Sequence, residues 1–180
     1  MECDSRTVAA AKLRGPGMTA STLDPTDFRN AMSKFASGVT VVTAHAPDGT
    51  PVGFTASAFS SLSLDPPLIL VCLDRRAECF EAFQEAETFG VSILKHGQDG
   101  IAMRFATRGA DKFGVADTSP GESGVPLVNG AIARVECSMH ERVDGGDHVI
   151  LVGRVTRAVT DEGEPLLHYS RQFGQFAPDG

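Results

Sequence analysis

The stretch from Gly53 to Asp74, GFTASAFSSLSLDPPLILVCLD, decides the fold of this chain. It starts with small and hydroxyl-bearing residues and runs through a Pro-Pro pair into an apolar segment, Leu68 to Leu73. An apolar segment of this length with both faces buried suits a central strand of a barrel. The small residues before it let backbone amides and hydroxyl groups approach a flat polar ligand. The stretch predicts a turn between two barrel strands that either binds a ligand or is only a well-formed turn.

Helix and strand signals extend outward from this stretch. Asp24-Pro25 is a helix start, and apolar residues at helical spacing follow it up to Gly38. From residue 131 to 139 the odd positions are apolar, whereas Arg134, Glu136 and Ser138 are polar, as in a half-buried strand. Further strands are expected at 39–44, from 51, at 68–73, at 89–94 and at 148–159, short helices at 78–86 and 98–106, and an acidic, Gly-rich loop at 109–124.

These elements predict a mainly β chain with about six strands and short helices. Strands and helices do not alternate regularly, which favours an antiparallel barrel over a doubly wound parallel sheet. The length of 180 residues and a hydrophobic content of 42% suit one domain. We expect this domain to span residues 24–180, after a flexible tail at 1–23 that mixes Gly, Pro, Ser, Thr and charged residues.

Charge and cysteine content narrow the function classes. A net charge of -7 and the lack of a basic run argue against a nucleic-acid partner. No apolar stretch matches a signal peptide or a membrane helix, so a cytoplasmic location is expected. The four cysteines lack CxxC spacing, which favours free thiols over disulfides or a metal site.

Common catalytic motifs are missing from the sequence. It has no GxGxxG after a strand, no P-loop, no GxSxG and no HExxH motif. The remaining features are loops able to bind a ligand, without an evident nucleophile. This pattern is typical of an enzyme whose cofactor supplies the reactive group.

Five motifs, taken together, resemble those of the short-chain flavin reductases, the reductase partners of two-component flavin-dependent monooxygenases. The resemblance extends over residues 28–176, in the family's order and spacing. It implies a Greek-key split β-barrel of the FMN-binding type, a homodimer, and hydride transfer from NADH, or possibly NADPH, to FAD or FMN. The reduced flavin would then be supplied to a partner monooxygenase. The motifs are Gly38–Thr43 (GVTVVT), Thr55–Ser61 (TASAFSS), Leu64–Pro67 (LDPP), Cys72–Asp74 (CLD) and Gly146–His148 (GDH).

The resemblance also implies a set of site residues. The loop Arg75-Arg76-Ala77 would lie near the flavin phosphate, and His148, at the start of a strand, would position the nicotinamide without acting as a general acid. Backbone amides around Thr55 to Ala58 or Ser92 would face flavin N1 and O2. The cofactor-binding residues expected are Thr55, Ala56, Ser57, Ala58, Cys72, Leu73, Asp74, Arg76, Ala77, Ser92, Phe105, Ala106, Lys112, Asp147, His148, Tyr169 and Arg171.

Some of these positions have other interpretations. The segment of Tyr169 and Arg171 either covers the flavin or NADH or packs in a dimer. Relatives often carry serine at the positions of Ala58 and Ala77 and asparagine at that of Ser92, so the choice between FAD and FMN stays open. Two other functions also remain: a flavoprotein oxidase of the same barrel type with a permanently bound flavin, and a flavin-binding module without turnover.

Overall fold

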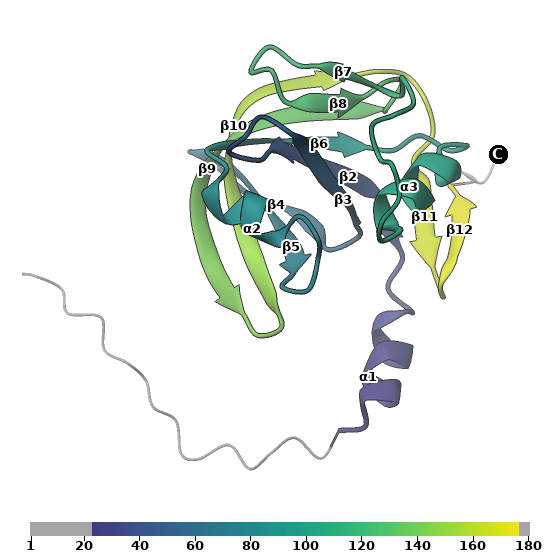
Figure 1. Cartoon of the computed structure of the whole chain (residues 1–180). Helices are drawn as coiled ribbons and strands as arrows, with labels where there is room; N and C mark the ends of the chain where they lie inside the picture. Colours follow the sequence, from purple (N-terminus) through teal and green to yellow (C-terminus); the bar gives the residue numbers. More distant parts are fainter. Residues whose placement is uncertain (1–22, 177–180) are drawn as a thin grey trace, which may run out of the picture.

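The structure is a computed structural model, and it describes residues 23–176. Most of the predicted tail at 1–23 therefore lies outside the described residues. The described part folds into an antiparallel β-structure with three short helices (Figure 1). The helices are α1 (Pro25–Met32), α2 (Phe80–Glu85) and α3 (Asp99–Ala106).

Seven strands form the main sheet, in the order β3-β2-β6-β9-β10-β5-β4, and all its neighbouring strands are antiparallel. Two small sheets complete the fold, one of β1, β11 and β12 and one of β7 and β8. The strands are β1 (Ser37–Gly38), β2 (Thr40–His45), β3 (Pro51–Ala56), β4 (Phe59–Leu64), β5 (Pro67–Asp74), β6 (Thr88–Ile93), β7 (Thr118–Pro120), β8 (Pro126–Val128), β9 (Ala133–Gly145), β10 (His148–Thr160), β11 (Leu166–Tyr169) and β12 (Gln172–Gln175).

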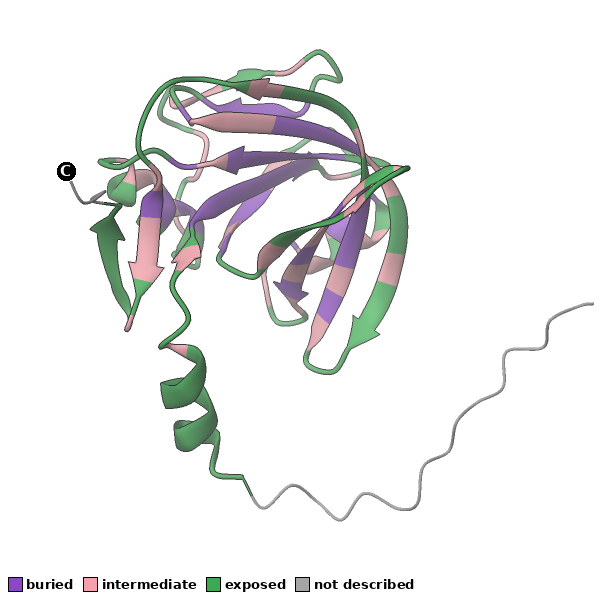
Figure 2. Ribbon diagram, turned by 180° about the vertical axis from the view of Figure 1, so that it is seen from behind, coloured by how far each residue is buried: buried purple, intermediate pink, exposed green. Residues whose placement is uncertain are grey.

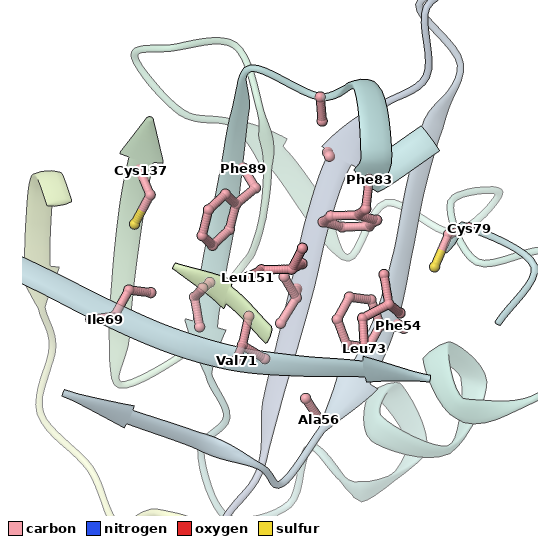
Figure 3. Close-up of a cluster of buried hydrophobic side chains, with 14 of the residues drawn as sticks. Phe54, Ala56, Ile69, Val71, Leu73, Cys79, Phe83, Phe89, Cys137 and Leu151 are labelled. Atoms are coloured by element: carbon pink, nitrogen blue, oxygen red, sulfur yellow. The ribbon is translucent and has the colours of Figure 1, made fainter. Parts of the chain in front are cut away.

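The main sheet curls around one hydrophobic core. Residues from β2, β3, β5, β6, β9 and β10 all enter this cluster, although β3 and β5 stand toward opposite ends of the sheet order. Phe83 of α2 is fully buried and meets Phe54 of β3 edge to face, with ring centroids 5.2 Å apart (Figure 3). Apolar burial on this scale is the main stabilising contribution to folding. The curled sheet agrees with the predicted barrel.

Local signals in the sequence position the elements as predicted. The side chain of Asp24 accepts a hydrogen bond from the backbone N–H of Thr26 at 2.6 Å and so caps α1. Gly49 adopts a φ of +83° in the turn between β2 and β3, a conformation that suits glycine. The Asp65-Pro66 turn connects β4 to β5, so the Pro-Pro corner does separate two paired strands.

The prediction of about six strands was too low, because several short strands carry little alternation. The expected loop at 109–124 contains β7, which pairs with β8. The C-terminal segment forms the hairpin β11–β12, and β11 also pairs with β1. These pairings join segments that are far apart in sequence or only three to four residues long, which a period-2 pattern does not reveal.

Glu136 lies on the opposite side of its strand from the core residues Val135 and Cys137, as the alternation predicts, but it is not exposed to solvent. It is 3% exposed because the turn after β7 covers it. Its carboxylate accepts hydrogen bonds from the backbone N–H groups of Glu122, at 3.1 Å, and Ser123, at 2.7 Å, and from the Ser123 hydroxyl. These donors satisfy a buried charge and lower the pKa of Glu136 against the opposing effect of burial.

Helix α1 stands away from the barrel, and none of its residues is buried within this chain (Figures 1 and 2). Phe28 and Met32 on this helix are more than half exposed, and Phe35 just after it is 79% exposed. The predicted amphipathic helix therefore exists, but its apolar side has no core to cover in one copy of the chain. Among the described residues, no helix is long and apolar enough to cross a membrane.

Candidate functional site

A cavity of about 500 Å³ opens at one end of the barrel, beside α3. This volume is in the usual range for a site that holds a small molecule or cofactor. Strand β3 and its continuation, the end of β5 and the segment after it, α3 with the loop that follows, and the start of β10 contribute to it. The lining residues are Phe54, Thr55, Ala56, Ser57, Ala58, Cys72, Leu73, Asp74, Arg76, Ala77, Glu78, Cys79, Phe105, Ala106, Arg108, Lys112 and His148.

The floor of the cavity is the end of the hydrophobic core. Phe54, Ala56, Leu73 and Cys79 belong to the core cluster and also line the cavity, and Figure 3 labels these four within the core. All four are buried, so the floor is apolar and fixed by packing. Such a floor suits a flat, largely apolar ring system better than a strongly hydrated ligand.

One wall depends on the close approach of α3 to β3. Gly53 permits this approach, because an added Cβ would lie 2.9 Å from the ring of Phe105 and 2.8 Å from the backbone oxygen of Val42. Next to it, the Thr55 hydroxyl donates a 2.6 Å hydrogen bond to the carbonyl oxygen of Ala102 in α3. Thr55 thus anchors α3, and its hydroxyl proton is already used within the protein.

Three cationic side chains, Arg76, Arg108 and Lys112, stand around the cavity. Arg76 donates from Nε, at 3.1 Å, and from Nη2, at 2.8 Å, to the carboxylate of Asp74, and these bonds hold the pKa of Asp74 well below its usual range. The carboxylate of Glu78 accepts two 3.0 Å bonds from the N–H of Gly109, with Arg108 Nε at 3.5 Å and Lys112 Nζ at 3.7 Å. The backbone bond from Gly109 is the main reason that the pKa of Glu78 is lowered. Glu78 therefore ties the loop after α3 to the start of α2.

His148 reaches the cavity from the tip of the β9–β10 hairpin. It stands opposite Asp74 on β5 and Gly145 on β9, so two neighbouring strands fix its backbone. Its Nδ1 lies 2.8 Å from Oδ1 of Asp147, and this hydrogen bond lowers the pKa of Asp147. The contact orients the imidazole ring through Nδ1, so Asp147 does not contact Nε2.

Burial favours the protonated thiol in the three cysteines that the structure describes, of which Cys72 and Cys79 line the cavity and Cys137 lies in the core. Burial raises the pKa of Cys79 to about 11 and that of Cys137 to about 12, and it also raises the pKa of Cys72. A thiol rather than a thiolate is a poor nucleophile and a poor metal ligand. All three are free, as predicted, while Cys3 lies outside the described residues. Residues 23–176 contain no group of three metal-binding side chains.

Most of the predicted site residues meet in this one cavity, although they come from four separate parts of the sequence. Those that line it are Thr55, Ala56, Ser57, Ala58, Cys72, Leu73, Asp74, Arg76, Ala77, Phe105, Ala106, Lys112 and His148.

Four predicted residues do not line the cavity. The hydroxyl of Ser92 is buried and accepts a 2.9 Å bond from the N–H of Val128, so it supports β8 instead. Asp147 contacts His148 from behind. Tyr169 lies under the ammonium of Lys34, 5.7 Å from its ring centroid, and Arg171 donates to Asn30 at 3.1 Å, so both face the α1 segment. Their predicted roles in cofactor binding stay predictions.

Four lining residues were not predicted: Phe54, Glu78, Cys79 and Arg108. Phe54 precedes the Thr55–Ala58 motif directly, and alternation along β3 places it in the core. Cys79 is buried in the floor. Glu78 and Arg108 are 30 residues apart and carry no motif, so the sequence offered no signal that they would meet.

A family model described as "Flavin reductase like domain" matches residues 32–177 of the chain. The chain belongs to this family. The match confirms the resemblance drawn from the sequence motifs, and the mainly β, antiparallel split-barrel fold is confirmed by the solved structures of flavin reductases that it resembles.

Three comparisons illustrate the similarity. The chain is 44% identical over 147 residues to the actinorhodin polyketide dimerase of Streptomyces coelicolor, covering 81% of this chain and 83% of that protein. It is 43% identical over 150 residues to an FMN reductase (NADH) of Agrobacterium fabrum, covering 83% and 85%. The NADH:FAD oxidoreductase of Streptomyces globisporus, solved with NAD and FAD fragments, is 39% identical with a TM-score of 0.81, covering 89% of this chain and 99% of that one.

Other relatives are named as reductase subunits or components of monooxygenases. Some relatives are longer: the chain spans 51% of the length of a probable flavin reductase of Rhizobium meliloti. The family, the split-barrel fold and the flavin reductase activity predicted from the sequence are thus confirmed, whereas the assignment of individual residues rests on the geometry of the cavity.

Proposed function

We propose that this chain is an NADH-dependent flavin reductase that reduces FAD or FMN and supplies the reduced flavin to a partner monooxygenase. The observation that carries the proposal is the meeting of three features in one cavity. These are the small-residue segment Thr55–Ala58, the cations Arg76, Arg108 and Lys112, and His148 at the hairpin tip.

The residues present fit a flavin. The apolar floor of Phe54, Ala56 and Leu73 would lie against the isoalloxazine ring, since such a ring gains free energy when it leaves water. A flavin phosphate would be met by Arg76, Arg108 and Lys112, which can make charge-assisted hydrogen bonds. Lys112 is suited to this role because its side chain is only 15% exposed and its carboxylate neighbour, Glu78, lies at the longer distance of 3.7 Å.

His148 would take the nicotinamide side of the same cavity. A bound flavin would accept at N5 the hydride that NADH gives up at C4. The protein's part is to hold the two rings against each other and to exclude water, so no side chain need carry a proton. The hydrogen bond that Nδ1 of His148 makes to the carboxylate of Asp147 fixes the imidazole ring for stacking or hydrogen bonding to the nicotinamide.

The relatives support both cofactors and the partner class. One is named as an FMN reductase that uses NADH, another as an NADH:FAD oxidoreductase, and others as reductase components of monooxygenases. We therefore propose either FAD or FMN as the flavin of this chain and NADH rather than NADPH as the hydride donor. The partner expected is a flavin-dependent monooxygenase. A cytoplasmic location stays a prediction from the sequence.

A homodimer is part of the proposal. Helix α1 buries no residue within one copy, although Phe28 and Met32 are apolar. Leu64, at the end of the edge strand β4, is 92% exposed. A second copy of the chain would cover these apolar side chains, and the contacts of Tyr169 and Arg171 with the α1 segment would then lie close to the interface. Sedimentation equilibrium of the full chain checks this: a monomer at micromolar concentration would contradict it.

The test of the proposed activity is direct. Purified protein is mixed with NADH or NADPH and with FAD, FMN or riboflavin, and the loss of reduced-nicotinamide absorbance is followed. Rapid consumption with NADH and a free flavin is expected. A yellow protein that retains its flavin but oxidises no NADH would favour the oxidase, and flavin binding without consumption by any pair would favour the non-catalytic module.

A further inference from the structure

Arg75 has contacts that set it apart from both of its neighbours. Asp74 and Arg76 line the cavity, but Arg75 does not, although the sequence placed the whole Arg75-Arg76-Ala77 loop near the flavin phosphate. Its side chain instead reaches the tip of the β9–β10 hairpin. There, Nε donates to the carbonyl oxygen of Gly146 at 3.0 Å, and Nη2 donates to Oδ1 of Asp144 at 2.9 Å.

The backbone of Arg75 binds the same hairpin tip. Its N–H donates to the carbonyl oxygen of Asp147 at 3.0 Å. Asp144 completes the arrangement, because the oxygen that accepts from Arg75 also accepts from the N–H of Gly146 at 3.1 Å. Gly146 itself has a φ of +81°, which suits glycine in a tight turn. Arg75 therefore holds Asp144, Gly146 and Asp147, the residues that lead into His148.

The guanidinium of Arg75 is also supported from below. It lies 5.8 Å from the ring centroid of Phe80, which packs against the hydrophobic core. A cation held over an aromatic ring has a preferred position. The hairpin tip is thereby connected through one side chain to the rigid part of the barrel.

We propose that Arg75 is a positioning residue: it fixes the Gly146-Asp147 turn and thereby orients His148 toward the nicotinamide. The inference rests on the proposed function, in which His148 takes the nicotinamide side. The path is short, since Arg75 binds the carbonyl oxygen of Asp147 while the carboxylate of the same residue holds Nδ1 of His148. Of the two adjacent arginines, Arg76 lines the flavin cavity and Arg75 binds the turn.

If Arg75 only stabilised the fold, its loss would be seen in the melting temperature rather than in the interaction with NADH. The side chains of Arg75 and Asp144 are 42% and 81% exposed, and ion pairs between exposed groups contribute little to stability. The loss of Arg75 should thus leave the melting temperature nearly unchanged while the turn gains freedom. The affected quantity is then the interaction with NADH rather than the stability of the protein.

The experiment compares R75Q and D144N with the wild-type full chain in steady-state assays at saturating flavin. For R75Q we expect the KM for NADH to rise at least fivefold, while kcat and the Kd for FAD or FMN stay within twofold. D144N should show a smaller change of the same kind, and R75K an intermediate one, because lysine cannot make both side-chain contacts at once. The control is R134Q, which removes a partly exposed ion pair with Asp161, at 2.6 Å. Arg134 stands opposite Val159 near the end of β10, away from His148 at the start of that strand.

A second readout tests whether Arg75 acts through His148. In the H148A background, R75Q should raise the KM for NADH by less than twofold, because the residue that it positions is gone. An equal effect in both backgrounds, an unchanged KM for R75Q, or a parallel rise in the flavin Kd would each overturn the inference. Failure of the proposed function would look different, since the wild-type protein itself would then consume no NADH.

Discussion

Gly53 provides a test of how the cavity wall is built. In G53A the new methyl group would lie 2.8 Å from the backbone oxygen of Val42 and 2.9 Å from the ring of Phe105. The first obstacle is backbone within the sheet, and the second is a side chain only 1% exposed, so neither can move freely. Two such contacts place the overpacking cost at about 3 kcal/mol.

Replacing a glycine within a strand returns about 0.5 to 1 kcal/mol through the lower entropy of the unfolded chain. The net destabilisation is then about 2 kcal/mol, which lowers the melting temperature of a chain of this size by about 4 to 8 °C. The new methyl group should push Phe105, and with it α3, away from β3. Because Phe105 and Ala106 line the cavity, this shift should also weaken flavin binding.

The assay is thermal unfolding followed by circular dichroism, together with flavin titration. G100A is the matched control, because Gly100 lies in the first turn of the same helix and nothing stands within 4 Å of its added Cβ. It should be neutral or stabilising by up to about 1 kcal/mol, with unchanged flavin affinity. A G53A protein that melts at or above the wild-type temperature would refute this account of the wall.

Three further predictions follow from the site. H148A should mainly raise the KM for NADH in initial-rate assays, with the flavin Kd unchanged; unaltered kinetics would remove His148 from the nicotinamide side. A58S should restore a hydroxyl at the cavity edge and tighten flavin binding by up to about 1 kcal/mol, several-fold in Kd by fluorescence titration, whereas no change would show that the flavin does not approach this position. Cys79 and Cys137, whose pKa values are raised to about 11 and about 12, should resist iodoacetamide at pH 8 until the protein is denatured, as judged by mass spectrometry. Because the native state favours the protonated thiols, their contribution to stability should be complete below about pH 8.5 and decline as the pH rises toward 11, so denaturant midpoints that stay flat over this range would contradict it.

The strands that bury one side or both were predictable from the sequence. Val41 and Val42 in β2 and the apolar run in β5 have the composition of buried strands, and glycine or proline marks the turns beside them. The short strands were not, because β1 and β11 pair across more than 120 residues and carry only two and four residues each. A local pattern has no information about a partner that distant.

Glu136 and Ser92 show the same limit for polar residues. Alternation placed Glu136 on the outer side of its strand, which is correct, but only the folded chain brings the turn at 121–123 over it. Ser92 was predicted to contact the flavin from its place in the family pattern, whereas the described fold uses its hydroxyl to hold β8. The side chains are where the strand period puts them, and their neighbours come from elsewhere in the chain.

By itself the sequence determined the family, the barrel and most of the residues that surround the cavity, because the Gly53–Asp74 stretch and the GDH motif place small, apolar and polar groups on paired strands. Only the tertiary structure decided how the charges are divided. It assigned Arg76 to the cavity and Arg75 to the hairpin turn, and it joined Glu78 to the loop after α3. The physical reason is that strand periodicity is a local property, whereas the partner of a charged side chain depends on which distant segments the fold brings within a few ångströms.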